Sequence, residues 1–171
     1  MSGIASLVDI APTVLDLAGL AQGSDVSGPG DEAVVRDGRS LLPLVVGTKS
    51  GGSDGSGTGQ GSSAAAWRTE LLMEYTGGDV IRFNHTEDAF NNSFRALRVI
   101  DANGTDLLYS EFTDCRTDWN FTSDPLEVEL FNLTADPWQM VNLALTAPDA
   151  QLAPLRRRVR ELYVCTGETC N

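Results

Sequence analysis

Apolar residues near the start of the chain recur at the spacing of one helix face. Ile10 and Val14 follow this spacing, and a second apolar row widens the stripe to most of the surface. Asp9 suits the N-cap, because its carboxylate can accept from free backbone N–H groups of the first turn, and Gly19 suits the end. The pattern therefore predicts a helix over residues 9–19 that needs cover on most of its surface.

Four later segments have the length and composition of β-strands, and Asn103-Gly104 between two of them is typical of a hairpin turn. In the last segment apolar residues alternate with Glu127 and Glu129, which favours a solvated carboxylate face over an acid/base pair. The predicted strands are Glu70–Tyr75, Phe94–Ile100, Asp106–Phe112 and Leu126–Phe131.

Two helical segments and one Gly/Ser run complete the pattern. Residues 41–46 predict a single helix turn, and residues 150–163 predict a longer helix with an apolar face and an outer arginine cluster: Arg156, Arg157, Arg158 and Arg160. Residues 51–63 are almost entirely Gly, Ser and Thr, so they predict a disordered loop. The fold class is therefore α+β: a small antiparallel sheet of three or four strands with a C-terminal helix.

Composition narrows the class of protein. The chain has 171 residues and a formal net charge of −12, which allows one ordinary domain and disfavours a nucleic-acid partner through repulsion of phosphates. No stretch approaches the roughly 18 to 20 apolar residues of a membrane span, since even residues 4–20 contain Asp9 and Asp16. We therefore expect neither nucleic acid nor membrane as a partner.

Sequons indicate a secreted glycoprotein. Chance gives about one Asn-x-Ser/Thr in such a composition, whereas five occur here, at Asn84, Asn91, Asn103, Asn120 and Asn132. The first basic residue is Arg36, so there is no signal-peptide pattern at the N-terminus. The alternative is accidental clustering of these residues in polar turns. The combination leads to the expectation that an N-terminal part of the natural protein is missing.

The three cysteines favour a disulfide over a metal site. Cys165 and Cys170 bracket a short turn that can bring them within bonding distance, which would leave Cys115 free or paired outside the chain. The alternative is a zinc site made by the three thiols and His85, but the spacing lacks the paired short loops of zinc modules. His85, the only histidine, lies in a polar segment that predicts an exposed loop, so no catalytic triad can be assigned.

Four blocks, in order, resemble the C-terminal portion of the formylglycine-dependent sulfatases, members of the alkaline phosphatase-like superfamily. Residues 7–19 resemble "VDIxPTxLxLAG", residues 37–44 "DGxSLLPLL", residues 67–75 "WRxxxLxEY" and residues 129–143 "xLYNLxxDPxExxNL". Residues 88–93 and the ending at 165–170 are similar to the branch of N-acetylglucosamine-6-sulfatases and plant or algal arylsulfatases.

The resemblance implies three parts and a role for each. Residues 1–47 would end the α/β sulfatase domain, residues 48–66 would be a disordered insertion, and residues 67–171 would form the C-terminal antiparallel subdomain. The family hydrolyses sulfate esters with a formylglycine made from C/S-x-P/A-x-R and with calcium, both held in its N-terminal domain. No segment here matches that motif, and Ser123-Asp124-Pro125-Leu126-Glu127 fails at its last position. No catalytic residue, calcium ligand or cofactor is therefore expected in this chain.

These observations predict a non-catalytic part of a sulfatase, inactive alone, that joins a missing catalytic domain. The whole enzyme would cleave a sulfated glycan or aryl sulfate and would be secreted, bound to the cell wall or lysosomal by ancestry. Arg82, His85 and Asn92 are the candidates for touching the sugar as a wall of the substrate cleft. The alternative is a stand-alone secreted module that holds anionic glycans with its arginine cluster.

Overall fold

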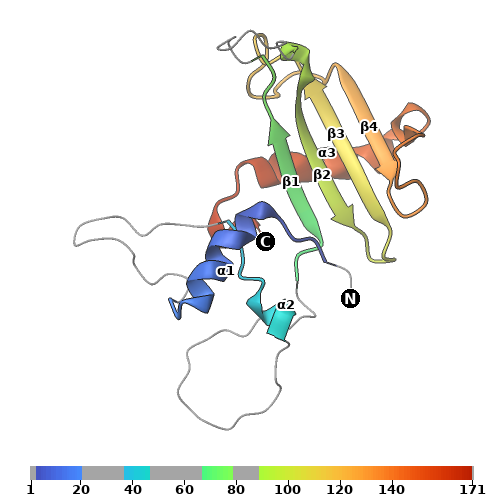
Figure 1. The fold of residues 1–171 in the computed structure, drawn as a ribbon. Helices are drawn as coiled ribbons and strands as arrows, with labels where there is room; N and C mark the ends of the chain where they lie inside the picture. The colour runs from blue at the N-terminus through green and yellow to red at the C-terminus, as the bar shows by residue number, and fades with distance from the viewer. Residues whose placement is uncertain (1–2, 21–36, 47–66, 79–88, 171) are drawn as a thin grey trace. The chain divides into compact units, whose positions relative to one another are not determined.

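The computed structural model describes residues 3–20, 37–46, 67–78 and 89–170 (Figure 1). The chain divides into two compact units: unit 1 comprises Met1–Thr69 and Cys165–Asn171, and unit 2 comprises Glu70–Val164. The Gly/Ser run predicted as a loop lies outside the described residues. Within the described ranges, no helix is long and apolar enough to cross a membrane.

Unit 2 is built on a four-stranded antiparallel sheet in the order β1-β2-β3-β4, which confirms the predicted α+β class (Figure 1). The predicted strand positions hold to within about one residue. The four strands are β1 (Glu70–Tyr75), β2 (Ser93–Ile100), β3 (Asp106–Thr113) and β4 (Glu127–Asn132).

The core of unit 2 lies between one face of the sheet and helix α3 (Asp149–Tyr163). The strand register places Leu72, Leu97, Tyr109 and Leu130 side by side across this face. Val159 and Leu162 of α3 are buried, as are the last three of those four sheet residues. Burying a row of large apolar side chains in this way supplies most of the free energy that stabilises such a layer.

The turn between β2 and β3 confirms the predicted hairpin. The Asp101 carboxylate accepts from the backbone N–H groups of Asn103 and Thr105, both at 2.8 Å. Gly104 has φ of +82°, a conformation that a side chain would strain. Asn103, in contrast, keeps a negative φ, so Gly104 alone supplies the left-handed residue of this turn.

The second face of the sheet is also partly buried, which corrects the simple alternation predicted for β4. Phe131 was expected on the solvated side, yet it is buried, together with Ala96 and Ser110 on the same face. Leu126 was expected inside, yet it lies before the strand and is exposed. Tyr75, Phe94 and Phe112 extend this face as an aromatic row, with neighbouring ring centroids 5.6 Å apart.

Three short 3-10 helices flank the regular elements of the sheet unit and the C-terminus. They are η3 (Phe90–Asn92), which leads into β2, η4 (Leu143–Leu145), which follows β4, and η5 (Gly167–Cys170). In η4, the Asn142 side chain accepts from Ala144 N and from Leu130 N, and its amide donates to Val128 O. One side chain thus satisfies both the helix start and the outer edge of β4.

Unit 1 holds the helix predicted from the first apolar pattern. It begins as the 3-10 helix η1 (Leu7–Asp9) and continues as α1 (Ile10–Leu17), which Gly19 ends with φ of +74°. The predicted helix turn is present as α2 (Leu42–Val46). Most apolar side chains of these helices are exposed: Leu7, Val8, Ile10, Val14, Leu17, Leu44, Val45 and Val46.

Candidate functional site

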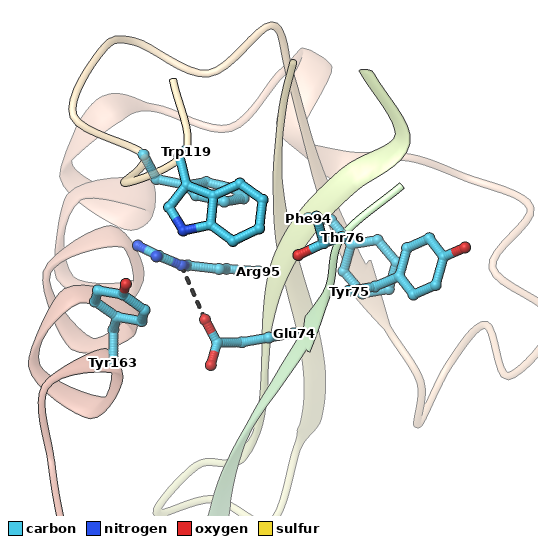
Figure 2. A pocket seen from close by; sticks show the side chains of 8 residues that line it. Glu74, Tyr75, Thr76, Phe94, Arg95, Trp119 and Tyr163 are labelled. Atoms are coloured by element: carbon cyan, nitrogen blue, oxygen red, sulfur yellow. Dashed lines mark hydrogen bonds and ion pairs between the residues drawn. The ribbon is translucent and has the colours of Figure 1, made fainter. Parts of the chain in front are cut away.

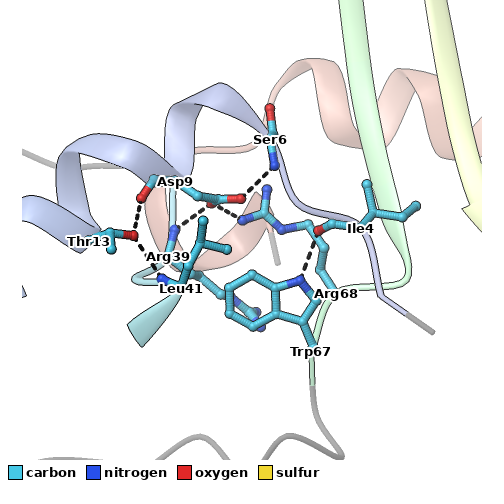
Figure 3. Close-up of polar contacts among 8 residues, drawn as sticks. All are labelled: Ile4, Ser6, Asp9, Thr13, Arg39, Leu41, Trp67 and Arg68. Atoms are coloured by element: carbon cyan, nitrogen blue, oxygen red, sulfur yellow. Dashed lines mark hydrogen bonds and ion pairs between the residues drawn. The ribbon is translucent and has the colours of Figure 1, made fainter. Parts of the chain in front are cut away.

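Asp9 is the buried centre of the polar contacts of unit 1 (Figure 3). Its carboxylate accepts from the backbone N–H groups of Ser6 and Arg39, both at 2.8 Å, and from the Arg68 guanidinium. Both partners of the Asp9–Arg68 ion pair are almost fully withdrawn from solvent. A buried charge of this kind is stable only when it is paired and hydrogen-bonded, and here two of the three partners, Arg39 and Arg68, come from distant segments.

This arrangement corrects the predicted role of Asp9. It does stand at the start of α1, but its side chain makes no capping bond to that helix. The carboxylate instead accepts from Ser6 N and completes a capping box for η1, while its remaining lone pairs bind Arg39 N and Arg68. Long-range partners outcompete the free N–H groups of the first turn, because only they can neutralise a fully buried charge.

Backbone contacts around Asp9 bring the same segments together. Trp67 Nε1 donates to Ile4 O at 2.9 Å, and Ile4 N donates to Arg68 O at 3.0 Å. A Cβ on Gly38 would lie 2.0 Å from Val8 O, so only glycine fits that approach. Residues from three of the four blocks of the sulfatase-like pattern thus meet at one buried ion pair, where they hold structure rather than perform chemistry.

Unit 2 has a hollow of ≈190 Å³ beside the end of β1 (Figure 2). Its lining combines five aromatic residues with one arginine, one carboxylate and one threonine: Glu74, Tyr75, Thr76, Phe94, Arg95, Trp119, Phe121 and Tyr163. In Figure 2 the Trp119 indole, the Arg95 side chain and the Tyr163 ring gather on one side of the strands, and Tyr75 lies on the other. We call this feature the Trp119 hollow.

Arg95 is fixed at the base of the Trp119 hollow. It is 4% exposed, its Nε donates to Glu74 Oε1 at 3.0 Å and one terminal nitrogen donates to Asn120 O at 3.2 Å. The guanidinium carbon lies 4.2 Å from the Phe121 ring centroid and 3.3 Å from that of Tyr163. Two aromatic faces and a carboxylate therefore stabilise this cation in one position.

The loop that carries Trp119 is held by Asp118. Its carboxylate accepts from the backbone N–H groups of Thr122 at 2.8 Å and Ser123 at 2.9 Å. These backbone bonds lower the pKa of Asp118, because they favour the charged form. Phe121 has φ of +55°, an uncommon conformation for a bulky residue that the surrounding contacts hold in place.

Two of the four arginines of the α3 cluster, Arg157 and Arg160, are exposed as predicted, whereas Arg156 and Arg158 are half-buried and pair with carboxylates of the sheet. Arg156 donates to Glu111 Oε1 at 3.1 Å, and Arg158 pairs with Glu70 and Glu161. Arg157 approaches Glu161 at 3.7 Å. The long side chains of Arg156 and Arg158 reach from the helix to carboxylates of the sheet, a contact that the helical pattern alone could not reveal.

Tyr109 belongs to the same network. Its hydroxyl donates to Glu111 Oε1 at 2.7 Å, and burial, followed by this bond, raises the pKa of Tyr109. On the opposite face of the sheet, burial and the neighbouring Glu127 raise the pKa of Glu129. Each shift has a structural cause, and neither residue faces the Trp119 hollow.

Of the predicted cleft-wall residues, Arg82 and His85 lie outside the described residues, as does the sequon at Asn84. Asn92 is described: it is exposed at the end of η3, next to β2. Among the other sequons, Asn91, Asn103 and Asn120 are exposed. Asn132 is half-buried and its side-chain oxygen accepts from Thr134 N and Ala135 N.

The predicted disulfide Cys165–Cys170 is present, with a Cα–Cα distance of 5.1 Å. Cys115 is free and half-buried, and its thiol donates to Gly77 O at 3.5 Å. Within the described part of the chain, no group of three or more His, Cys, Asp or Glu side chains could hold a metal ion.

The sequence pattern missed the Trp119 hollow. Its residues come from three separate places: the end of β1 with the start of β2, the loop at 119–121 and the last turn of α3. The strand register, which pairs Glu74 with Arg95, was the one available signal. The sequon at 120–122 had drawn attention to that loop only as a glycosylation site.

The chain is similar to curated sulfatases over nearly all of its length. N-acetylglucosamine-6-sulfatase of Homo sapiens is 30% identical over 180 residues, which cover 95% of this chain and 27% of that protein. Its counterpart in Capra hircus is 28% identical over 95% of this chain and 26% of that protein. An arylsulfatase of Volvox carteri is 31% identical over 166 residues, which cover 95% of this chain and 22% of that protein. No family model matches the chain.

One solved structure, BT4656 in complex with its substrate D-glucosamine-2-N,6-O-disulfate, aligns with a TM-score of 0.49 and 22% identity. The alignment covers 91% of this chain and 23% of that chain. Each protein compared is thus much longer than the segment it shares with this chain. Over 95% of its length, this chain is related to the N-acetylglucosamine-6-sulfatases and arylsulfatases, and it spans about a quarter of their length.

Proposed function

We propose that the chain serves a sulfatase as its C-terminal, non-catalytic part and docks onto a catalytic domain through the apolar side of α1 and α2. The main support is that the apolar side chains of these helices are exposed to solvent. Leu7 is 82% exposed and Val45 is 77% exposed, within a group of eight exposed apolar residues in η1, α1 and α2. Contiguous apolar surface of this kind marks a protein interface, because leaving it in water is costly.

The chemistry of sulfate ester hydrolysis supports a non-catalytic role for this chain. Negative charge on the transferring group needs a metal or fixed cationic donors around it. Three arginines of α3, Arg156, Arg157 and Arg158, are already paired with carboxylates. The sequence also contains no C/S-x-P/A-x-R segment that could supply the family's nucleophile. We expect the chain alone to release no sulfate.

In the complete enzyme, this part would complete one wall of the substrate cleft. Asn92 and the segment containing Arg82 and His85 are the residues we propose for contact with a sulfated sugar or aryl sulfate. Calcium and the nucleophile would come from the catalytic domain. The five sequons and the disulfide support a secreted, cell-wall or lysosomal enzyme.

A chimera tests this proposal. The segment of human N-acetylglucosamine-6-sulfatase that matches this chain is replaced by the chain, and hydrolysis of N-acetylglucosamine-6-sulfate is measured. We expect activity in the chimera and none in the chain alone. Val14→Glu, at an exposed apolar position, should abolish activity of the chimera, whereas Gln151→Glu, at an exposed polar position of α3, should not.

A folding control distinguishes an effect of Val14→Glu on docking from an effect on the stability of the chain. In the chain alone, Val14→Glu should change the free energy of unfolding by less than about 0.5 kcal/mol, because the side chain is already in solvent. Equal activity of both variant chimeras would overturn docking through α1, and sulfate release by the chain alone would overturn the non-catalytic role.

A further inference from the structure

We propose that the Trp119 hollow is a binding site for one pyranose ring of a carbohydrate, which would stack on Trp119. The inference rests on the proposed function only for its choice of sugar, an N-acetylglucosamine unit. The site itself stands on its own geometry. Asn92, the described residue among those proposed above for the cleft wall, does not line it.

The aromatic residues supply the stacking surface. Trp119 is 63% exposed although it lines a concave site, and Tyr163, also exposed, lines the same hollow from the last turn of α3. The C–H groups on one face of a pyranose ring carry partial positive charge and pack against the negative face of an aromatic ring. An exposed indole beside a hollow is thus suited to stacking on a sugar ring.

Polar groups around the rings can orient the hydroxyls of such a sugar. Glu74 lines the hollow with a side chain that is 48% exposed, and its Oε1 accepts from Arg95. Thr76 adds a hydroxyl to the lining, and Figure 2 shows it close to Arg95 and Glu74. Few polar groups among aromatic walls are the usual composition of a small-molecule site.

Charge and size select a neutral single ring. The Arg95 cation is already balanced by Glu74 and covered by two aromatic faces, so it offers little to a sulfate group. The net charge of −12 adds repulsion of anions. At ≈190 Å³ the hollow is smaller than the roughly 300 Å³ of the smallest drug-sized sites, which fits one sugar ring of a longer glycan.

Two sources could supply that ring. One is a separate glycan, such as a neutral unit of a substrate. The other is the chain's own glycan at Asn120, an exposed sequon residue that stands between the lining residues Trp119 and Phe121. A glycan attached there would reach the hollow at high effective concentration. Both sources present the same ring face to Trp119.

The test uses the full chain in two forms. The first is made in bacteria, without glycans, and is titrated with chitotriose while saturation-transfer NMR detects contact with the sugar protons. We expect a saturable signal, weakened about tenfold in affinity by Trp119→Ala. Trp138→Ala is the matched control, because Trp138 is 82% exposed but lies outside the hollow, and it should leave the signal unchanged.

The second form is made in eukaryotic cells, and its glycans are trimmed to a single N-acetylglucosamine. If the Asn120 glycan fills the hollow, this form should fail to bind chitotriose, and Asn120→Gln should restore binding whereas Asn103→Gln should not. If a separate glycan is the ligand, both forms should bind equally. The proposed binding site is refuted if the bacterial form shows no saturable signal. It is also refuted if Trp138→Ala weakens that signal as much as Trp119→Ala does. Circular dichroism checks that each variant is folded.

Discussion

The two units differ in the kind of side chain that they bury. Unit 2 buries a row of large side chains, with Leu97, Tyr109 and Leu130 at or below 1% exposure. Unit 1 buries a carboxylate and a guanidinium instead, and leaves the apolar side of its helices in solvent. The difference teaches that unit 2 has an apolar core of its own, whereas the described part of unit 1 is organised around a buried ion pair and leaves the apolar side of its helices exposed.

Breaking the Asp9–Arg68 pair should have the largest effect. Asp9→Ala leaves the buried Arg68 charge uncompensated, which should cost about 4 kcal/mol of the local stability of unit 1. Hydrogen exchange should show lost protection in residues 3–18 and unchanged protection in the sheet. Asp16→Ala is the control: its carboxylate accepts from the Ser40 hydroxyl at the surface, so about 1 kcal/mol is expected. Equal effects of the two variants would contradict the central role of Asp9.

Leu97→Ala should have the second largest effect, and it should destabilise unit 2. Leu97 is 1% exposed in the middle of the sheet, so truncation leaves a cavity and should lower the free energy of unfolding by about 3 kcal/mol. Denaturant unfolding followed by circular dichroism measures it. Leu126→Ala, at an exposed leucine, should cost less than about 0.5 kcal/mol. A cost for Leu97→Ala as small as that for Leu126→Ala would show that the sheet face is not the core.

Removal of the disulfide should have a smaller effect. Replacing Cys165 and Cys170 by Ser opens a loop with a sequence separation of 5, for which about 2 kcal/mol is expected. Because these residues belong to unit 1, exchange in that unit should rise while exchange in the sheet stays unchanged. Cys115→Ser removes the free thiol and should reproduce neither change.

The smallest effect concerns pH and the Trp119 loop. The folded pKa of Asp118 lies below its usual value, so this carboxylate stabilises the loop above its unfolded pKa and loses that contribution as pH falls through the folded pKa. The amide signals of Thr122 and Ser123 should therefore shift on acidification below about pH 4. In Asp118→Asn the acid-induced shift should disappear; its persistence would assign the shift to another group.

Regular elements were predictable from the sequence because one local rule decides each of them. The strands β1 and β3, the hairpin at Gly104 and the Cys165–Cys170 disulfide required only strand-like length and composition, turn chemistry and spacing. Contacts between distant residues were not predictable in this way. The apolar pattern of α1 does not indicate that Asp9 pairs with Arg68. Helical spacing does not indicate that Arg158 pairs with Glu70 of the sheet.

The Trp119 hollow illustrates the same limit at a candidate site. Arg95 reads as a solvent-facing residue of a strand, yet it is buried because rings from a loop and from α3 close over it. Only the fold brings residues 74, 95, 119 and 163 together. The sulfatase relationship, in contrast, depended on short ordered blocks that the sequence displays directly, and the curated relatives confirm it over 95% of the chain.

The most direct test of the account is sulfate release from N-acetylglucosamine-6-sulfate, measured in parallel for the chain alone and for the chimera with the human catalytic part. The account predicts release by the chimera, loss of release when Val14→Glu blocks the apolar side of α1, and none from the chain alone. Release by the chain alone, or a chimera that is indifferent to Val14→Glu, would contradict a non-catalytic part that docks through its exposed helices.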